Sequence, residues 1–503
     1  MSTAVRVIKN TGWLYAKMGI TSILSLVTTR LILNSLGQAD FGIYNVVGGA
    51  IAMLGFINAA MASTTQRFLN YSEGEGDPEK QRSVFNVSII LHSGIAALMV
   101  LILALASFAF FGGVLDIPTE RVGAAKVVYL CLVFSTAVTI LTAPFDAVIT
   151  SHENMKYYAF VGIIESLLKL SVAVACVHTT FDKLILYGIL MAFIPLISLS
   201  IMLSYCSTHY SECVFAPRKY FSSRSLKEMG GFAGWSFAMT STSMVTQYGF
   251  GIVLNSFFGV LLNAAYGVAN QLSGMLSSVS TLAQKAYNPI LIKSEGSGDR
   301  KKLTYVSLFG CRVSFLIFGT FAIPAILLMP ELLNLWLKKV PEWAVIFARL
   351  QLLRILLEQL YSGLNSAILA SGKIKQYAVF TSLAFILPIL ILPVLFSLGF
   401  KPYWLFILWI IFWPGVCGTL AAVFANVNVG IRISQYIKNV IAPSAIVILV
   451  SILPPVVSQA AGVSKTVFYL MVLLQVMMFV VLGWIFLLQK RERYKILSFI
   501  HRV

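Results

Sequence analysis

Long apolar segments recur along the whole chain, separated by short polar ones. Many are about 20 residues long, the length that a helix needs to cross about 30 Å of hydrocarbon. Such a helix satisfies its own backbone hydrogen bonds in lipid, whereas a membrane barrel would show short segments of alternating polarity. We therefore predict an all-α integral membrane protein with about 14 transmembrane helices.

The predicted spans are joined by short connections, of which the longest cannot fold as domains. The helix count near 439–489 depends on whether one helix continues through Pro454 and Pro455. The spans are placed at about 11–36, 41–65, 84–111, 123–150, 157–178, 184–206, 230–257, 263–290, 304–329, 343–370, 377–398, 403–427, 439–461 and 465–489.

Composition and charge agree with a bilayer environment. Only 11% of the 503 residues are charged, against about 25% in soluble domains. The net charge of +18 comes from Lys and Arg concentrated in alternate connections, and the positive-inside rule places those connections in the cytoplasm. Both termini are then cytoplasmic, and the charge is explained without nucleic acid. The basic set comprises the two termini, 66–83, 151–156, 207–229, 291–303, 371–376 and 428–438.

Three short segments recur at nearly one offset. Ser72–Asp77 reappears at 294–299, Leu33–Ser35 at 254–256 and Ala147–Ser151 at 367–371. Because each pair has the same place in the topology, we predict two related six-helix halves with parallel orientation, and a cleft between them that permits alternating access. The predicted organisation is an N-terminal half at 1–206, a cytoplasmic linker at 207–229, a C-terminal half at 230–427, and a helix pair with a basic tail at 428–503.

Two motifs resemble those of bacterial oligosaccharide flippases, which belong to the multidrug/oligosaccharidyl-lipid/polysaccharide (MOP) exporter superfamily. One comprises Val27–Leu33 followed by Phe41–Tyr44, and the other Ser225–Met229 followed by Gly231–Trp235. The resemblance implies transfer of undecaprenyl-pyrophosphate-linked oligosaccharide from the cytoplasmic to the periplasmic leaflet of the inner membrane. It also implies a central cavity lined by helices 1, 2, 7 and 8. Such proteins serve O-antigen, capsule or exopolysaccharide synthesis, with a polymerase and glycosyltransferases of that pathway as partners.

The helices from 230 to 290 are unusually polar for membrane spans. We expect a wet cavity wall there, whose amides and hydroxyls suit a sugar, although small polar residues also allow close helix packing. The expected wall residues are Asn58 in the second span and Gln247, Asn255, Asn270 and Gln271.

Ionisable residues within the spans are the other candidates, because charge in hydrocarbon is costly. The guanidinium fork suits phosphate oxygens, although residues near helix ends can also snorkel to water. Glu165/Lys169 and Arg354/Glu358 are spaced i,i+4, as expected for an internal ion pair or for a gate. Asp146 is a further candidate for an ion pair or a gate. The predicted headgroup-binding set is Lys17, Arg30, Lys285, Arg312, Arg349 and Arg354.

No catalytic, cofactor or metal motif is evident. The five histidines and six cysteines are scattered, and the Gly-rich turns lack the Gly-Lys-Ser/Thr ending of a nucleotide loop. We therefore expect a transporter with no catalytic residues, metal or cofactor. Three alternatives stay open: a flippase for the peptidoglycan precursor, a cation-coupled multidrug exporter, and a membrane polymerase or glycosyltransferase. The exporter would need a carboxylate deep in helix 1, where this chain has Lys17 and Arg30; the enzymes would need a larger external loop.

Overall fold

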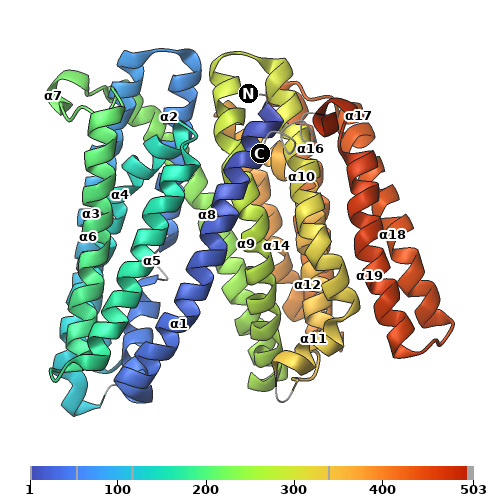
Figure 1. The fold of residues 1–503 in the computed structure, drawn as a ribbon, viewed down its shortest axis with the longest axis horizontal. Helices are drawn as coiled ribbons and strands as arrows, with labels where there is room; N and C mark the ends of the chain where they lie inside the picture. Colours follow the sequence, from blue (N-terminus) through green and yellow to red (C-terminus); the bar gives the residue numbers. More distant parts are fainter. Residues whose placement is uncertain (1–2, 53–54, 115–117, 338–339, 495–503) are drawn as a thin grey trace. The chain divides into compact units, whose positions relative to one another are not determined.

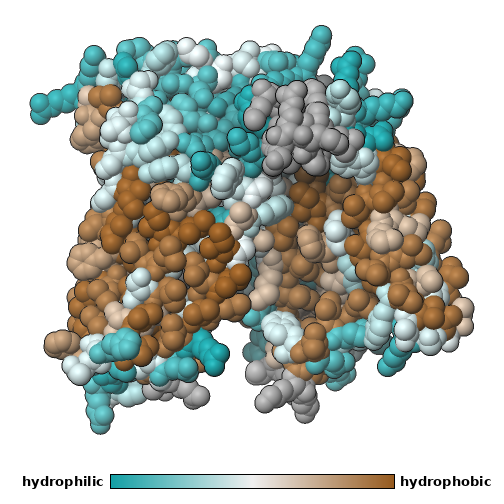
Figure 2. Space-filling view, in the orientation of Figure 1, coloured by the Kyte–Doolittle hydropathy of each residue, from teal (hydrophilic) through white to brown (hydrophobic). Residues whose placement is uncertain are grey.

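The computed structural model describes residues 3–52, 55–114, 118–337 and 340–494, and in these ranges it consists of helices without strands (Figure 1). The described residues form two compact units, Asn10–Phe237 and Ala238–Val503, the second including Met1–Lys9. On the visible face of each unit, hydrophobic residues cover the middle and hydrophilic residues the ends (Figure 2). The predicted all-α membrane class is confirmed.

The N-terminal unit is built around α4 (Val122–Ser151), which packs against α2, α3, α5 and α6. Its core includes Val128, whose side chain lies against Gly188 of α6. A short π-helical turn, Phe110–Val114, extends α3, and a 3-10 turn, Thr119–Arg121, precedes α4. The remaining helices are α1 (Thr3–Ala52), α2 (Gly55–Glu75), α3 (Pro78–Ala109), α5 (Met155–His178), α6 (Lys183–His209) and α7 (Pro217–Tyr220).

The C-terminal unit is built around α10 (Arg300–Leu327), which packs against α9, α12, α13 and α19. Gly363 of α13 lies so close to α10 that a Cβ there would collide with the Ser307 carbonyl oxygen. The other helices are α8 (Ser223–Phe258, which begins in the first unit), α9 (Val260–Gly296), α11 (Met329–Trp336), α12 (Ala344–Gln359), α13 (Ser362–Ser371), α14 (Lys375–Ser397), α15 (Trp404–Ile410), α16 (Gly418–Phe424), α17 (Ile433–Tyr436), α18 (Ala442–Ala460) and α19 (Lys465–Leu482).

Ten helical segments in the described ranges are long and apolar enough to span a membrane. They match ten of the predicted spans, and one of them runs through Pro454 and Pro455 without a break. The other four predicted spans are helical in the residues that the structure describes, but they are not among these ten segments. Helices α8 and α9 are long enough but too polar. Span 343–370 is divided between α12 and α13, and span 41–65 includes residues 53–54, which lie outside the described ranges.

The duplication is visible in the backbone. Gly37 and Gly259 have φ of 78° and 79°, and Gly76 and Gly298 have φ of 72° and 71°. Each pair is 222 residues apart, and glycine tolerates this left-handed region without steric cost. The turns also share their caps, because Asp77 accepts a hydrogen bond from the Lys80 amide and Asp299 accepts one from the Lys302 amide. Equivalent turns in the two halves therefore have the same local structure.

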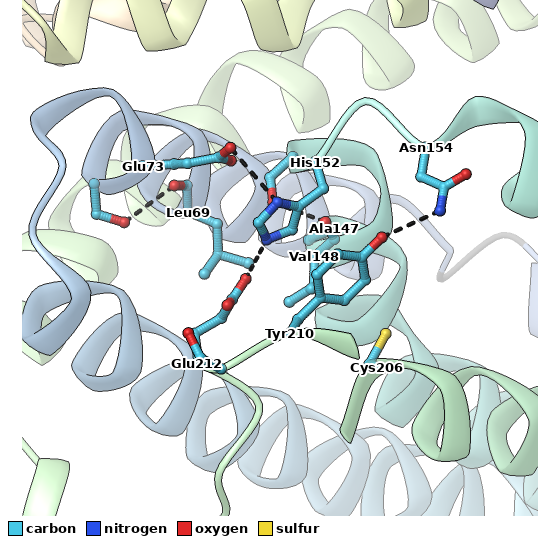
Figure 3. Close-up of polar contacts among 12 residues, drawn as sticks. Leu69, Glu73, Ala147, Val148, His152, Asn154, Cys206, Tyr210 and Glu212 are labelled. Carbon is cyan, nitrogen blue, oxygen red and sulfur yellow. Dashed lines mark hydrogen bonds and ion pairs between the residues drawn. The ribbon is translucent and has the colours of Figure 1, made fainter. Parts of the chain in front are cut away.

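At one end of the N-terminal unit, a histidine joins three connections of the basic set (Figure 3). His152 Nε2 lies 2.5 Å from Glu212 Oε1, His152 Nδ1 lies 3.6 Å from Glu73 Oε1, and the imidazole stacks on Tyr210. Desolvation raises the pKa of Glu212, but the hydrogen bond and the charge of His152, together with a backbone hydrogen bond and the charge of Arg82, outweigh it, so the net pKa is lower than usual. In the C-terminal unit, Asn428 Nδ2 donates to the Lys373 carbonyl, which likewise joins two connections of that set.

The opposite end of the N-terminal unit is held by a second cluster. Arg121 lies 2.5 Å from Asp40 and 2.6 Å from Asp182, and so joins the connections that precede α4 and α6 to the part of α1 beyond Gly37. The hydrogen bond from Arg121 lowers the pKa of Asp182, which also caps α6 through the amides of Leu184 and Ile185.

A buried ion pair anchors the segment that follows α19. Arg312 and Glu492 are only 3% and 1% exposed, and Arg312 Nη2 lies 2.9 Å from Glu492 Oε1. Arg312 also donates to the carbonyls of Leu487 and Leu308. The sequence predicted Arg312 as a headgroup ligand, but the structure gives it a structural partner 180 residues away.

We expect Arg312→Ala to destabilise the protein by about 3–5 kcal/mol, because the Glu492 carboxylate is left buried without its partner. Thermal unfolding of the detergent-purified protein measures this. Arg224→Ala is the matched control, since the pair of Arg224 with Glu228 is 89% and 48% exposed and contributes at most about 1 kcal/mol. The double variant Arg312→Met/Glu492→Leu should recover most of the stability. If Arg312→Ala and Arg224→Ala lowered the stability equally, Arg312 and Glu492 would not form a stabilising buried pair.

Candidate functional site

A polar cavity of about 730 Å³ lies within the C-terminal unit, between α8, α9 and α12. Its wall carries many amide and hydroxyl groups, together with one arginine. The polar lining residues are Gln247, Tyr248, Asn255, Asn263, Tyr266, Asn270, Ser273, Ser277, Gln351 and Arg354.

The pattern of residues along α8 and α9 explains this wall. Asn263, Asn270 and Ser277 are spaced by seven residues and therefore share one face of α9. Ala265 and Ala269 are fully buried in the core of the unit. Helix α8 follows the same rule, with a fully buried Leu254 beside an exposed Asn255. One face of each helix thus packs against the core while the other faces the cavity.

Arg354 is 6% exposed and is held in place by its neighbours. Its Nε donates to Gln351 Oε1 at 3.2 Å, and its Nη1 donates to Glu358. Gln351 in turn donates to Asn270 Oδ1. These contacts link α12 to α9 and fix the orientation of the guanidinium plane.

Two tryptophans complete the surroundings of Arg354. The guanidinium carbon lies 4.2 Å from the ring centroid of Trp409 and 5.1 Å from that of Trp413. Aromatic faces stabilise a cation without neutralising its charge. Among the described residues, Nη2 of Arg354 makes no hydrogen bond. The guanidinium of Arg354 is therefore fixed in orientation, and its Nη2 can donate to a ligand. The other polar groups of the cavity lining are neutral.

The structure brings together four of the residues that the sequence singled out: Gln247, Asn255, Asn270 and Arg354 all line the cavity. These polar residues of α8 and α9 thus border a cavity; a role of this wall in binding sugar stays a prediction. Gln271 is exposed and lies outside this lining.

Other predicted site residues lie elsewhere. Asn58 is half-buried in the N-terminal unit. Arg349 donates to the carbonyls of Ile326 and Leu327 and so caps the end of α10. Lys285 is half-buried on α9 but is not part of the cavity lining. Arg30 is exposed on α1 and makes no hydrogen bond or ion pair with any residue that the structure describes.

A second, smaller polar pocket of about 120 Å³ lies within the N-terminal unit. It gathers Lys17, Asp146 and Glu165 from three helices, together with Tyr158. Lys17 Nζ lies 4.1 Å from the Tyr158 ring centroid. Glu165 pairs with Lys169 at 2.7 Å. Both i,i+4 ion pairs predicted from the sequence are therefore present; their role as gates stays a prediction.

Sequence reasoning missed the residues that support Arg354. Gln351 lies three residues before it, and Trp409 and Trp413 are four residues apart, so each set shares a helix face. That spacing was the available signal. In the described ranges, no group of three or more His, Cys, Asp or Glu residues is arranged to hold a metal ion.

Comparison with known proteins shows which family the chain matches. A model of the polysaccharide biosynthesis protein family matches residues 7–295. A search of curated proteins found no match.

Several solved structures share the fold. A MOP superfamily transporter from Pyrococcus furiosus, whose description refers to the reverse polarity of its binding pocket, has 13% identity and a TM-score of 0.70, covering 87% of this chain and 97% of its own. A MATE protein in complex with MaL6 has 14% identity and a TM-score of 0.67, covering 87% and 98%. An outward-facing multidrug resistance MATE family transporter of the MOP superfamily has 13% identity and a TM-score of 0.70, covering 87% and 97%.

At such low identity these structures establish the fold alone, which is that of MOP superfamily transporters. The family model covers more than half of the chain, and its match agrees with the resemblance found in the sequence motifs. The chain therefore belongs to the polysaccharide biosynthesis protein family.

Proposed function

We propose that this protein is a flippase that moves undecaprenyl-pyrophosphate-linked oligosaccharide from the inner to the outer leaflet of the bacterial cytoplasmic membrane. The observation that carries the proposal is the cavity beside Arg354. Its volume of about 730 Å³ falls in the usual range for ligand sites. Amide and hydroxyl groups on its wall match the many donors and acceptors of a sugar.

Arg354 supports an anionic headgroup. A guanidinium donates strong, charge-assisted hydrogen bonds to phosphate oxygens, and Nη2 of Arg354 can donate one, because Nε and Nη1 are bonded to Gln351 and Glu358. Glu358 pairs with Arg354, but it is absent from the cavity lining, which contains no carboxylate. A cationic drug would thus meet an arginine and no counter-charge. This disfavours the multidrug-exporter alternative.

The orientation and transport cycle are part of the proposal. Connections of the basic set lie together at one end of the N-terminal unit, in the cluster around His152. By the positive-inside rule this end faces the cytoplasm, with both termini on that side. Transport would proceed by alternating access of the two halves, with the lipid chain remaining in the bilayer. A gradient, or consumption of the product by a polymerase, would drive it.

Deleting the gene tests the substrate directly. The expected result is loss of surface polysaccharide and accumulation of its lipid-linked repeat unit on the cytoplasmic face, measured by lipid extraction and by enzymatic accessibility in inverted and right-side-out vesicles. Accumulation of the peptidoglycan precursor would instead support the alternative flippase. Normal surface polysaccharide in a strain without a redundant flippase would refute the proposal.

Neutral substitutions at Arg354 and Glu358 separate ligand binding from structure. Arg354→Gln should lower export at least about tenfold, the expected loss for one charge-assisted hydrogen bond. The double variant Arg354→Gln/Glu358→Gln leaves no unpaired charge, so it should stay defective if Arg354 contacts the headgroup. Surface polysaccharide per unit of membrane-inserted protein, in the complemented deletion strain, is the measurement.

Arg349→Gln is the matched control for these variants. Arg349 lies on the same helix, α12, but donates to carbonyls at the end of α10 and not to the cavity, so its replacement should keep most of the export. Full recovery in the double variant would show that Arg354 and Glu358 form only a structural pair.

A further inference from the structure

A groove of about 420 Å³ between the beginnings of α1 and α5 combines apolar walls with a basic rim. Ile20, Phe160 and Ile163 contribute to the walls, while Lys17 and Lys156 stand at the rim beside Trp13. No acidic residue lines the groove. All of these residues lie in the N-terminal unit, whereas the residues that line the cavity beside Arg354 belong to the C-terminal unit.

The groove is graded in polarity along the membrane normal. Membrane-spanning segments begin at Lys9 and Met155, so Trp13 and Lys156 lie near the membrane–water interface. Ile20 and Ile163 each come seven residues after Trp13 and Lys156, or about 10 Å deeper at the helical rise of 1.5 Å per residue. The polar end of the groove thus lies at headgroup level and its apolar end lies in hydrocarbon. This is the polarity of a lipid.

The two lysines are held in the groove. Lys156 Nζ lies 5.7 Å from the Trp13 ring centroid, and the stem of Lys17 packs where a Cβ on Gly162 would collide with it. Neither lysine forms an ion pair with a residue in the described ranges. The Lys156 ammonium is therefore available to an anion at headgroup level, while Lys17, whose Nζ lies over the Tyr158 ring, adds positive charge deeper along the groove.

The duplicated half shows that the fold does not require these lysines. Trp235, Tyr377 and Phe380 occupy the positions equivalent to Trp13, Tyr157 and Phe160, at offsets of 222 and 220. Met239 and Gln376 stand in place of the two lysines, and Lys375 lies one position earlier. The aromatic frame is thus common to both halves, but only the N-terminal half adds this pair of cations. A ligand with negative charge explains the difference.

We propose that this groove binds an anionic glycerophospholipid, whose phosphate lies beside Lys156, with the charge of Lys17 nearby, and whose acyl chain lies along Ile20, Phe160 and Ile163. The site does not depend on the identity of the transported substrate. It places a resident membrane lipid against α1, next to the pocket that contains Asp146 and Glu165.

Trp13 is a native reporter for this site. The full-length protein is reconstituted in phosphatidylcholine nanodiscs that contain increasing fractions of brominated phosphatidylglycerol, and its fluorescence is compared with that of Trp13→Phe. The difference isolates Trp13 from the other tryptophans. Brominated phosphatidylglycerol should quench Trp13 at a lower fraction than brominated phosphatidylcholine does. Lys156→Ala should raise the required fraction about fivefold, and Lys17→Ala/Lys156→Ala should raise it further.

Lys126→Ala is the matched control, because Lys126 also stands beside an aromatic ring, Phe111, but at the other end of the same unit. It should leave the quenching unchanged, and unfolding temperatures verify that each variant is folded. Equal quenching by the two brominated lipids, or no effect of Lys156→Ala, would overturn the proposal. Displacement of phosphatidylglycerol by an equimolar amount of undecaprenyl phosphate would overturn it too, because the groove would then be a substrate site.

Discussion

A charge inside hydrocarbon must be paired or hydrogen-bonded, and this constraint organises the membrane-spanning part of the protein. Arg354 is paired with Glu358, Lys169 with Glu165, and Arg312 with Glu492. The location of the partner determines what each basic residue can do. Arg312 is enclosed by its partners and holds the chain after α19, whereas Arg354 keeps one nitrogen available beside a cavity. Similar side chains are therefore fully enclosed in one place and border a cavity in another.

The same constraint separates the helices into two classes. Segments such as α14 and α19 are apolar enough to span a bilayer by composition alone. Their backbone N–H and C=O groups are hydrogen-bonded within the helix, as a segment in lipid requires. Helices α8 and α9 are not, because their amides and hydroxyls need partners or water. In the C-terminal unit these polar helices border the cavity together with α12. A helix that is too polar for lipid therefore indicates an internal polar surface. This is why α8 and α9, the most polar of the predicted spans, point to the cavity.

Local spacing accounts for most of what the sequence could predict. Helix positions, the duplicated turns and the i,i+4 pairs depend only on residues within a few turns of one another, and the structure contains them. Partners that are distant in sequence could not be predicted in this way. Glu492 is 180 residues from Arg312, and the carbonyls that hold Arg349 belong to another helix. Of the six basic residues predicted to bind a headgroup, only Arg354 lines the cavity of the C-terminal unit.

Duplication explains why the two halves can carry different chemistry on one frame. Lys17, Asp146 and Glu165 surround a polar pocket in the N-terminal half, and the equivalent positions of the C-terminal half hold Met239, Ser366 and Phe385. None of these three is charged, although the turns and caps of the two halves agree. The charged pocket is therefore an addition to the fold and not a requirement of it. Lys17 shares this pocket with the two carboxylates, and Glu165 also pairs with Lys169, so opposite charges lie close together there. The two halves thus combine one frame with different chemistry: grouped charges in the N-terminal half, and in the C-terminal half a hydrogen-bonding cavity with one arginine on its wall.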